Sequence, residues 1–182
     1  MSELNIEFGC GGNREYLPGD WIATDLAAGG PDIRQPLPYA DFTVDNIRAE
    51  HVLEHVTAPD GLRFLMECYR VLKHGGKLRI CVPNLSKPYY NGIPDRLRDG
   101  ILNHGHLSAY NHPLLFQFLI AAGFKYGKNQ TDIKLTERED LDGHWRACMS
   151  NPDVMKLPEA QREAAAKALD DNHTTRVNAW KM

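Results

Sequence analysis

Short apolar runs alternate with amphipathic stretches along the first half of the chain, and this alternation restricts the fold more than any other feature. The apolar runs are Leu4–Phe8, Trp21–Thr24, Asn46–Ala49 and Lys77–Val82. Between the last two runs, helical spacing separates Leu62, Leu65, Met66, Tyr69 and Leu72. We expect His74-Gly75-Gly76 to end this helix. Buried strands alternating with helices predict an α/β fold with a parallel sheet flanked by helices.

The second half of the chain carries weaker signals. Helices are expected at Pro113–Ala122 and Leu157–Leu169, a strand-like stretch begins at Phe124, and Thr174–Trp180 alternates like a final strand. Residues 84–112 are polar and aromatic without periodicity, which is typical of a functional loop in a compact domain. No composition break divides the chain, so residues 1–182 are expected to form one domain.

Composition and charge exclude several classes of protein. The net charge of −3 argues against a nucleic-acid partner, because nucleic-acid-binding proteins normally carry a basic excess. No stretch approaches the about 18 apolar residues of a membrane span, and no apolar leader precedes the first strand, so we expect neither a membrane partner nor a signal peptide. The four cysteines form no CxxC pair, which favours reduced thiols and a cytoplasmic location.

The first apolar run leads into glycines, in the sequence I-E-F-G-C-G-G at residues 6–12. A dinucleotide fingerprint needs a third glycine where Arg14 stands, and its acidic residue lies about 20 residues further on, later than Asp25. A phosphate-binding P-loop is excluded because no Gly-Lys-Ser/Thr follows. A nicotinamide-dependent oxidoreductase is therefore disfavoured, and a glycine turn without any ligand stays an alternative.

Five segments in order resemble the motifs of class I S-adenosylmethionine-dependent methyltransferases, and in particular the small predicted bacterial enzymes of the type-11 group. The segments read E-F-G-C-G-G-N, I-A-T-D, D-I with P-L-P-Y-A-D-F-T-V-D, A-E-H-V-L-E-H-V, and E-C-Y-R-V-L-K-H-G-G-K-L-R-I-C-V-P-N. The resemblance implies a Rossmann-like, mostly parallel sheet of seven strands, with helices on both faces and an antiparallel last strand at Thr174–Trp180. Residues 4–84 would then form the donor-binding half, and residues 85–182 would supply the acceptor side.

The resemblance and the chemistry of the donor together predict how S-adenosylmethionine is held. The backbone of Gly9, Cys10, Gly11 and Gly12 can approach the ribose and the methionine arm, because glycine has no side chain to obstruct it. Asp25, followed by Leu26, stands at a strand end, where its carboxylate can accept hydrogen bonds from both ribose hydroxyls. An N-cap or a plain surface aspartate is the alternative reading of Asp25.

The remaining donor contacts follow from the resemblance alone. Asp32 matches the acidic residue that reads the adenine edge, and Ile33 would pack on the ring, although P-D-I-R-Q-P would equally make a turn. Glu7 would order the glycine loop or hold the donor's amino group through water. Backbone carbonyl groups of Ala49 and Glu50 would accept from the same amino group.

Candidates for a general base lie beyond the donor residues. A histidine with a near-neutral pKa suits proton removal from an acceptor, and His51, His55 and His106, with Tyr110, surround the expected acceptor side. Each of them taken alone is as easily a structural residue. His51 and His55 have the spacing of metal ligands on a helix, but they do not form H-E-x-x-H and no cysteine cluster accompanies them, so no metal is expected.

The sequence therefore predicts methyl transfer from S-adenosylmethionine to a small-molecule or carbohydrate-like acceptor. A non-catalytic nucleoside-binding regulator or partner subunit stays the alternative, because little chain is left for a first helix between Gly12 and Trp21, where Pro18 and Gly19 intervene. With the first strand so near the start of the chain, a lid would have to come from residues 84–112 or from a second subunit. A homodimer could form through Leu157–Leu169 or the final strand.

Overall fold

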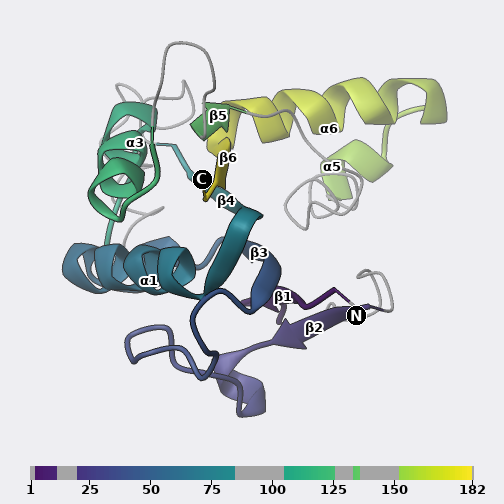
Figure 1. The fold of residues 1–182 in the computed structure, drawn as a ribbon. Helices are drawn as coiled ribbons and strands as arrows, with labels where there is room; N and C mark the ends of the chain where they lie inside the picture. Colours follow the sequence, from purple (N-terminus) through teal and green to yellow (C-terminus); the bar gives the residue numbers. More distant parts are fainter. Residues whose placement is uncertain (1–2, 12–19, 85–104, 126–132, 136–151, 182) are drawn as a thin grey trace.

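The computed structural model describes residues 3–11, 20–84, 105–125, 133–135 and 152–181. Six strands in this part of the chain form one sheet, in the order β2-β1-β3-β4-β6-β5 (Figure 1). They are β1 (Asn5–Phe8), β2 (Trp21–Thr24), β3 (Val44–Glu50), β4 (Leu72–Pro83), β5 (Ile133–Leu135) and β6 (Thr174–Trp180). The first four are parallel, whereas β6 pairs antiparallel with both β4 and β5.

The described residues form six strands, so the expectation of seven is wrong for this part of the chain. Between β2 and β3 the chain forms the 3-10 helix η2 (Leu26–Ala28) and a series of turns instead of a strand. Pro31, Pro36 and Pro38 lie in this segment, and proline has no N–H group to donate to a neighbouring strand. In the described sheet β2 is therefore an edge strand.

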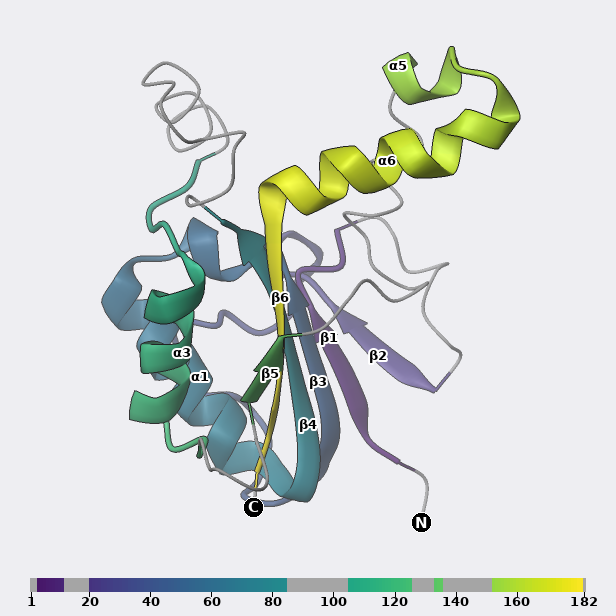
Figure 2. The ribbon, with the colours of Figure 1, turned by 90° about the horizontal axis from the view of Figure 1, so that it is seen from above.

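The two faces of the sheet differ in chemistry because side chains alternate along each strand. One face joins α1 (Ala58–Val71) and α3 (His112–Ala121) in a single hydrophobic core that includes Ile6, Phe8, Ile47, Leu78 and Ile80. The alternate positions are buried and polar, namely Asn5, Glu7, Arg48, Glu50 and Arg79. Figure 2 shows α1 and α3 on one side of the sheet, whereas α6 (Glu159–His173) and α5 (Pro152–Met155) project from its end. The resemblance implies helices on both faces of the sheet. In the described part of the chain, helices cover only one face.

The two helices of the core begin at caps that the sequence supplies. The Thr57 side chain accepts a hydrogen bond from the backbone N–H of Asp60 at 3.3 Å, and Pro59 stands at the start of α1. Asn111 caps α3 in the same way by accepting from the N–H of Leu114 at 2.9 Å. Such caps satisfy backbone donors that have no partner within the helix.

Two expected boundaries are corrected. The strand expected at Lys77–Val82 begins earlier, at Leu72, because Leu72 already pairs with Val44 and the register shifts before Asn46. His74-Gly75-Gly76 therefore lies inside β4, with Gly75 at a φ of 81°. Phe124 is a buried core residue after α3, and the next strand is Ile133–Leu135.

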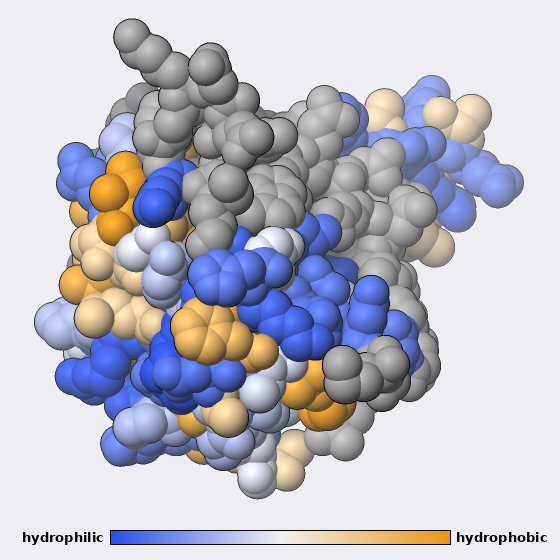
Figure 3. Space-filling view, in the orientation of Figure 1, coloured by the Kyte–Doolittle hydropathy of each residue, from blue (hydrophilic) through white to orange (hydrophobic). Residues whose placement is uncertain are grey.

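The surface carries no large apolar area on the face that Figure 3 shows, where apolar side chains form small separate patches among polar ones. The large hydrophobic residues exposed in the described part are likewise distributed over several elements, and they are Ile22, Leu26, Phe42, Met66, Leu107, Ile120 and Met155. Among the helices of that part, none has the length and apolar character needed to cross a membrane.

Candidate functional site

A cavity of about 450 Å³ opens at the carboxyl ends of β1, β2 and β3. The chain runs from β1 to β2 on one side and then to β3 on the other side of β1, and open α/β sheets bind ligands where the strand order reverses in this way. Five residues of the cavity wall were predicted to bind the donor: Gly9, Asp25, Leu26, Asp32 and Ile33. The others are Phe8, Thr24, Pro31, Arg34, His51, Val52, His55 and Val56. Five predicted donor residues thus share one cavity with His51 and His55, two of the candidates on the acceptor side.

The glycine loop is held against β2 by its backbone. The N–H groups of Gly9 and Cys10 both donate to the carbonyl oxygen of Thr24, at 2.8 and 3.3 Å. Gly9 and Gly11 have φ angles of 72° and 54°, a region that residues with a Cβ rarely adopt. A Cβ on Gly9 would overlap the Val52 side chain, whereas a Cβ on Gly11 would meet nothing within 4 Å. The close approach that requires glycine is therefore at Gly9.

This difference makes the two glycines a matched pair. Gly11→Ala is expected to cost about 1–2 kcal/mol of folding free energy through backbone strain alone. Gly9→Ala adds overlap with Val52, and overpacking costs about 1–3 kcal/mol more. Thermal unfolding measures both losses, and Val52→Ala should restore part of the stability lost in Gly9→Ala. Equal losses in the two single variants would contradict the contact.

The Asp25 side chain also holds the glycine loop. One carboxylate oxygen, Oδ2, accepts from the N–H of Gly11 at 3.0 Å, and the other, Oδ1, accepts from the N–H of Ala27 at 2.9 Å. Asp25 is thus the N-cap of η2, as the alternative reading had it, and it also lines the cavity. A carboxylate has about four acceptor positions, so each oxygen can still accept a hydroxyl hydrogen.

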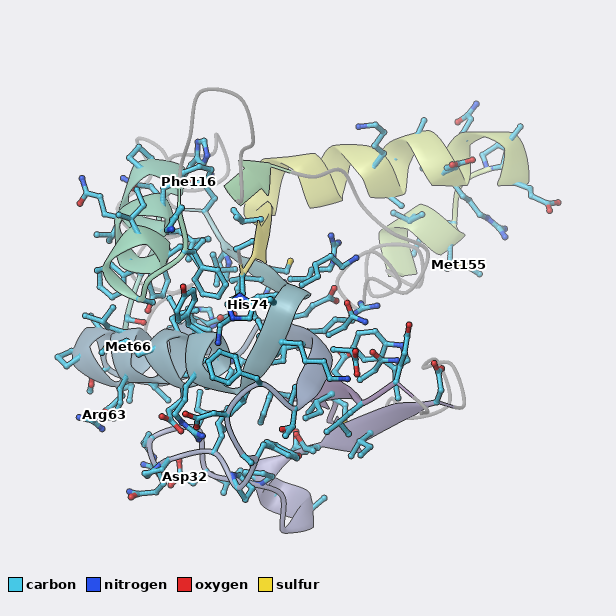
Figure 4. The ribbon with its side chains drawn as sticks, in the orientation of Figure 1. Asp32, Arg63, Met66, His74, Phe116 and Met155 are labelled. Carbon is cyan, nitrogen blue, oxygen red and sulfur yellow. The ribbon has the colours of Figure 1, made fainter. Side chains whose placement is uncertain are left out.

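Asp32 and Ile33 lie in the turn that the sequence P-D-I-R-Q-P allowed. The Asp32 carboxylate accepts two hydrogen bonds from the Arg34 Nε, at 2.9 and 3.1 Å, and one from Nη2 at 2.7 Å. These hydrogen bonds lower the pKa of Asp32. The Arg34 carbonyl accepts a hydrogen bond from the Arg63 side chain on α1 at 3.1 Å. Figure 4 shows Asp32 and Arg63 near each other at the lower left of the molecule. An adenine amino group at Asp32 would therefore share its oxygens with Arg34.

The other predicted donor residues in the described part of the chain do not line the cavity. Glu7 is buried, with its Oε2 at 3.2 Å from Nε of Arg48. Ala49 is fully buried, and the Glu50 side chain accepts from Arg48 at 2.7 Å and from Arg79 at 3.2 Å. Cys10 is also buried, whereas Gly12 lies outside the described residues. Glu7 thus makes its ion pair within the sheet instead of along the cavity wall.

His51 and His55 border the cavity, but they do not share a helix. His51 directly follows β3 with a φ of 55°, and His55 ends the 3-10 helix η3 (Leu53–His55). Nδ1 of His51 lies 3.0 Å from Oε1 of Glu54, and Nε2 lies 3.7 Å from Sγ of Cys81. Burial acts to lower the pKa of His51, but Cys81 and then Glu54 outweigh it and raise the pKa well above its usual value. The protonated ring is favoured, which suits a hydrogen-bond donor better than a base.

His106 reaches the same place from a distant part of the chain. The N–H groups of Leu107 and Ser108 donate to the Glu54 carbonyl at 2.7 and 3.1 Å, and the Ser108 hydroxyl donates to the Leu53 carbonyl at 3.0 Å. The rings of His55 and His106 meet edge to face, with centroids 4.9 Å apart. Glu54, whose carbonyl joins these two segments, was not among the predicted site residues, although it stands in the quoted motif A-E-H-V-L-E-H-V.

Tyr110 is a core residue, which corrects its assignment as a catalytic candidate. It is 1% exposed and packs edge to face on Phe118, with ring centroids 5.8 Å apart. Gly61 leaves space for its hydroxyl, because a Cβ there would stand 2.7 Å away. Burial raises the pKa of Tyr110. The hydroxyl therefore stays protonated and away from the cavity.

Tyr110→Phe tests this correction. The hydroxyl has no hydrogen-bond partner among the described residues, so its removal is expected to change stability by less than about 1 kcal/mol. Affinity for S-adenosylmethionine should stay at the wild-type value. Chemical denaturation and calorimetry measure the two quantities. A loss above about 2 kcal/mol would mean that the hydroxyl has a bonded partner.

A model of a known protein family matches part of the chain. Residues 23–80, which include Asp25, η3, all of α1 and most of β4, match the family model described as a methyltransferase domain. No curated protein matches the chain.

Solved structures with the same fold cover almost the whole chain at low identity. A phosphoethanolamine N-methyltransferase 2 of Haemonchus contortus, in complex with phosphomonomethylethanolamine and S-adenosylhomocysteine, has a TM-score of 0.61 and 14% identity. It covers 100% of this chain, which spans only 49% of that protein. S-adenosylmethionine-dependent methyltransferases of Archaeoglobus fulgidus (TM-score 0.61, 19% identity, 98% and 86% covered) and Mesorhizobium loti (0.59, 14%, 99% and 91%) are similar over most of their own length. These likenesses establish the fold.

Proposed function

We propose that this chain is a class I S-adenosylmethionine-dependent methyltransferase that methylates a small, polar acceptor, and its fold and the match of residues 23–80 to a methyltransferase domain support this. The observation that carries the proposal is the cavity at the switch point of the sheet. It unites Gly9, Asp25 and Ile33 with His51 and His55. At about 450 Å³ the cavity lies within the usual range for small-molecule sites, about 300–1,000 Å³.

The donor would be held by residues that already support one another. Gly9 brings backbone within reach of the ribose and the methionine arm, and Asp25 offers its remaining acceptor positions to the two ribose hydroxyls. Ile33 presents an apolar surface to the adenine ring, and the Asp32–Arg34 pair stands where the adenine edge would lie. The chain thus provides an acceptor for each polar part of the nucleoside and an apolar surface for its base.

Methyl transfer itself breaks the bond between sulfur and the methyl carbon and forms a bond from that carbon to the acceptor atom. The sulfonium becomes a neutral thioether, and a hydroxyl or ammonium acceptor loses one proton. Positioning of donor and acceptor can supply up to roughly 7–11 kcal/mol of the barrier. His51 and His55 border the cavity and would lie on the acceptor side, where an imidazole can orient a hydroxyl or amine.

The volume of the cavity and one solved structure of the same fold both favour a small acceptor. The Haemonchus contortus enzyme binds phosphomonomethylethanolamine, a small polar molecule. We propose an acceptor of that size with a hydroxyl or amine, including carbohydrate-like molecules. A homodimer contact through α6 or β6 stays a prediction, as does the assignment of residues 85–182 to the acceptor side.

Calorimetry with S-adenosylmethionine, S-adenosylhomocysteine and NAD tests the donor. Both sulfur nucleosides should bind and NAD should not, and binding of NAD alone would overturn the proposal. Transfer of a labelled methyl group across a panel of small hydroxyl and amine compounds then tests the reaction. Tight donor binding with no transfer to any compound would favour a non-catalytic, nucleoside-binding regulator.

A further inference from the structure

We infer that Glu54, His55 and His106 form a binding site for a first-row divalent transition-metal ion at the edge of the cavity. One carboxylate oxygen and one nitrogen from each imidazole all lie within 4.8 Å of one another. No metal was expected from the sequence, because the ligand pair considered there was His51 and His55. The structure instead combines His55 with its sequence neighbour and with a histidine from another segment.

The carboxylate of Glu54 is the strongest evidence for a ligand. Glu54 is 1% exposed, and burying an ionised carboxylate is costly unless it is paired. Its Oε1 faces His51 at 3.0 Å, whereas its Oε2 is buried and has no hydrogen-bond partner in the described part of the chain. A cation between Glu54, His55 and His106 would supply the missing interaction.

The backbone holds the two imidazoles beside this carboxylate. Leu107 and Ser108 donate to the carbonyl of Glu54, so the residue directly before them, His106, is tied to the turn that carries both other ligands. The His51 ring hydrogen-bonds the Glu54 carboxylate, and such outer partners orient metal ligands and tune their basicity. Backbone hydrogen bonds and the His51 ring therefore both restrict the positions of the three ligands.

Ligand type and spacing indicate the class of ion. Two imidazoles and one carboxylate suit zinc, iron, cobalt or nickel, whereas magnesium and calcium prefer all-oxygen sites. Metal–ligand distances are about 2.0–2.2 Å, so two ligand atoms on one tetrahedral ion lie roughly 3.3–3.6 Å apart. The three ligand atoms lie within 4.8 Å of one another, and rotation of the exposed His55 side chain can bring them to this spacing.

Three protein ligands leave at least one coordination position for another molecule. Because His55 also lines the cavity, that position borders the space where the acceptor would enter. This part of the inference rests on the proposed function: a hydroxyl bound to the ion would lose its proton more readily before the methyl group arrives. Metal binding itself requires neither donor nor acceptor.

Zinc titration of the full chain tests the site. After treatment with a chelator and its removal, calorimetry should detect one zinc ion per chain, and cobalt should give the absorption bands of a bound ion. His55→Ala and His106→Ala should each weaken zinc binding by more than about 100-fold, because even the loss of an outer partner of a ligand costs about 10–100-fold. His74→Ala is the matched control, since His74 stacks on Phe42 at 5.3 Å and should leave zinc affinity unchanged.

Thermal unfolding of the two ligand variants without metal shows whether they are folded. Failure of the wild type to bind zinc would overturn the inference. Wild-type zinc affinity in each of the single variants His55→Ala and His106→Ala would also overturn it. Equal affinity for magnesium and zinc would also overturn it. Calorimetry with S-adenosylmethionine in the presence of chelator is separate, so loss of the metal site and loss of the donor site are distinguishable.

Discussion

Asp25→Ala is expected to weaken binding of S-adenosylmethionine by roughly 100- to 10,000-fold. Two hydrogen bonds from ribose hydroxyls to a carboxylate contribute about 1.5–3 kcal/mol each, and each 1.4 kcal/mol is tenfold in affinity. The same substitution removes the cap on Ala27 and the brace on Gly11, which should lower stability by about 1–2 kcal/mol. Calorimetry measures the affinity, and thermal unfolding measures the stability.

Asp25→Asn keeps one of these contacts. Asparagine caps helices about as well as aspartate, so this variant should keep the cap on Ala27. Its amide nitrogen cannot accept the N–H of Gly11, so it should recover only part of the stability lost in Asp25→Ala. It also loses the charge and one of the acceptor oxygens, so its affinity for the donor should lie between those of the wild type and Asp25→Ala. If Asp25→Ala retains the affinity of the wild type, the ribose does not bind at Asp25. If both variants bind equally weakly, the oxygen that asparagine keeps contributes nothing to donor binding.

Several residues of the cavity wall could be predicted because their signals are local. Trp21–Thr24 was predicted with its observed bounds. A glycine or aspartate that directly follows a strand lies at the carboxyl end of that strand. Parallel strands then bring Gly9, Asp25 and the end of β3 to one place without further information. Asp32 was ambiguous for a physical reason, since the same carboxylate that could read adenine also closes a turn with Arg34.

Contacts between segments far apart in the sequence could not be predicted. His106 was a candidate, but its place beside Glu54 depends on backbone hydrogen bonds between two distant segments, and no periodicity encodes that contact. Tyr110 stands in a polar stretch, yet Phe118 and Gly61 provide a place for it in the core. The count of seven strands came from the resemblance, whereas the prolines between β2 and β3, which a loop tolerates and a sheet does not, are visible in the sequence.

The buried charges of the polar face are the other feature that composition conceals. Arg48 and Arg79 are 2% and 0% exposed, in strands whose alternate residues form the apolar core. The Glu50 Oε1 lies 2.7 Å from Arg48 and 3.2 Å from Arg79, so one carboxylate serves both guanidinium groups. Glu7 adds a second carboxylate at 3.2 Å from Arg48.

Glu50→Gln is expected to destabilise the fold by about 3–5 kcal/mol, because it removes one partner of buried ion pairs and leaves positive charge out of contact with water. For a chain of this size that loss lowers the melting temperature by about 6–20 °C. Arg63→Gln is the matched control: its ion pair with Asp60 is nearly as short, 2.8 Å, but Arg63 is 54% exposed. Exposed pairs contribute about 0–1 kcal/mol, so the control should unfold within a few degrees of the wild type. A loss below about 1 kcal/mol in Glu50→Gln would mean that water reaches the pair.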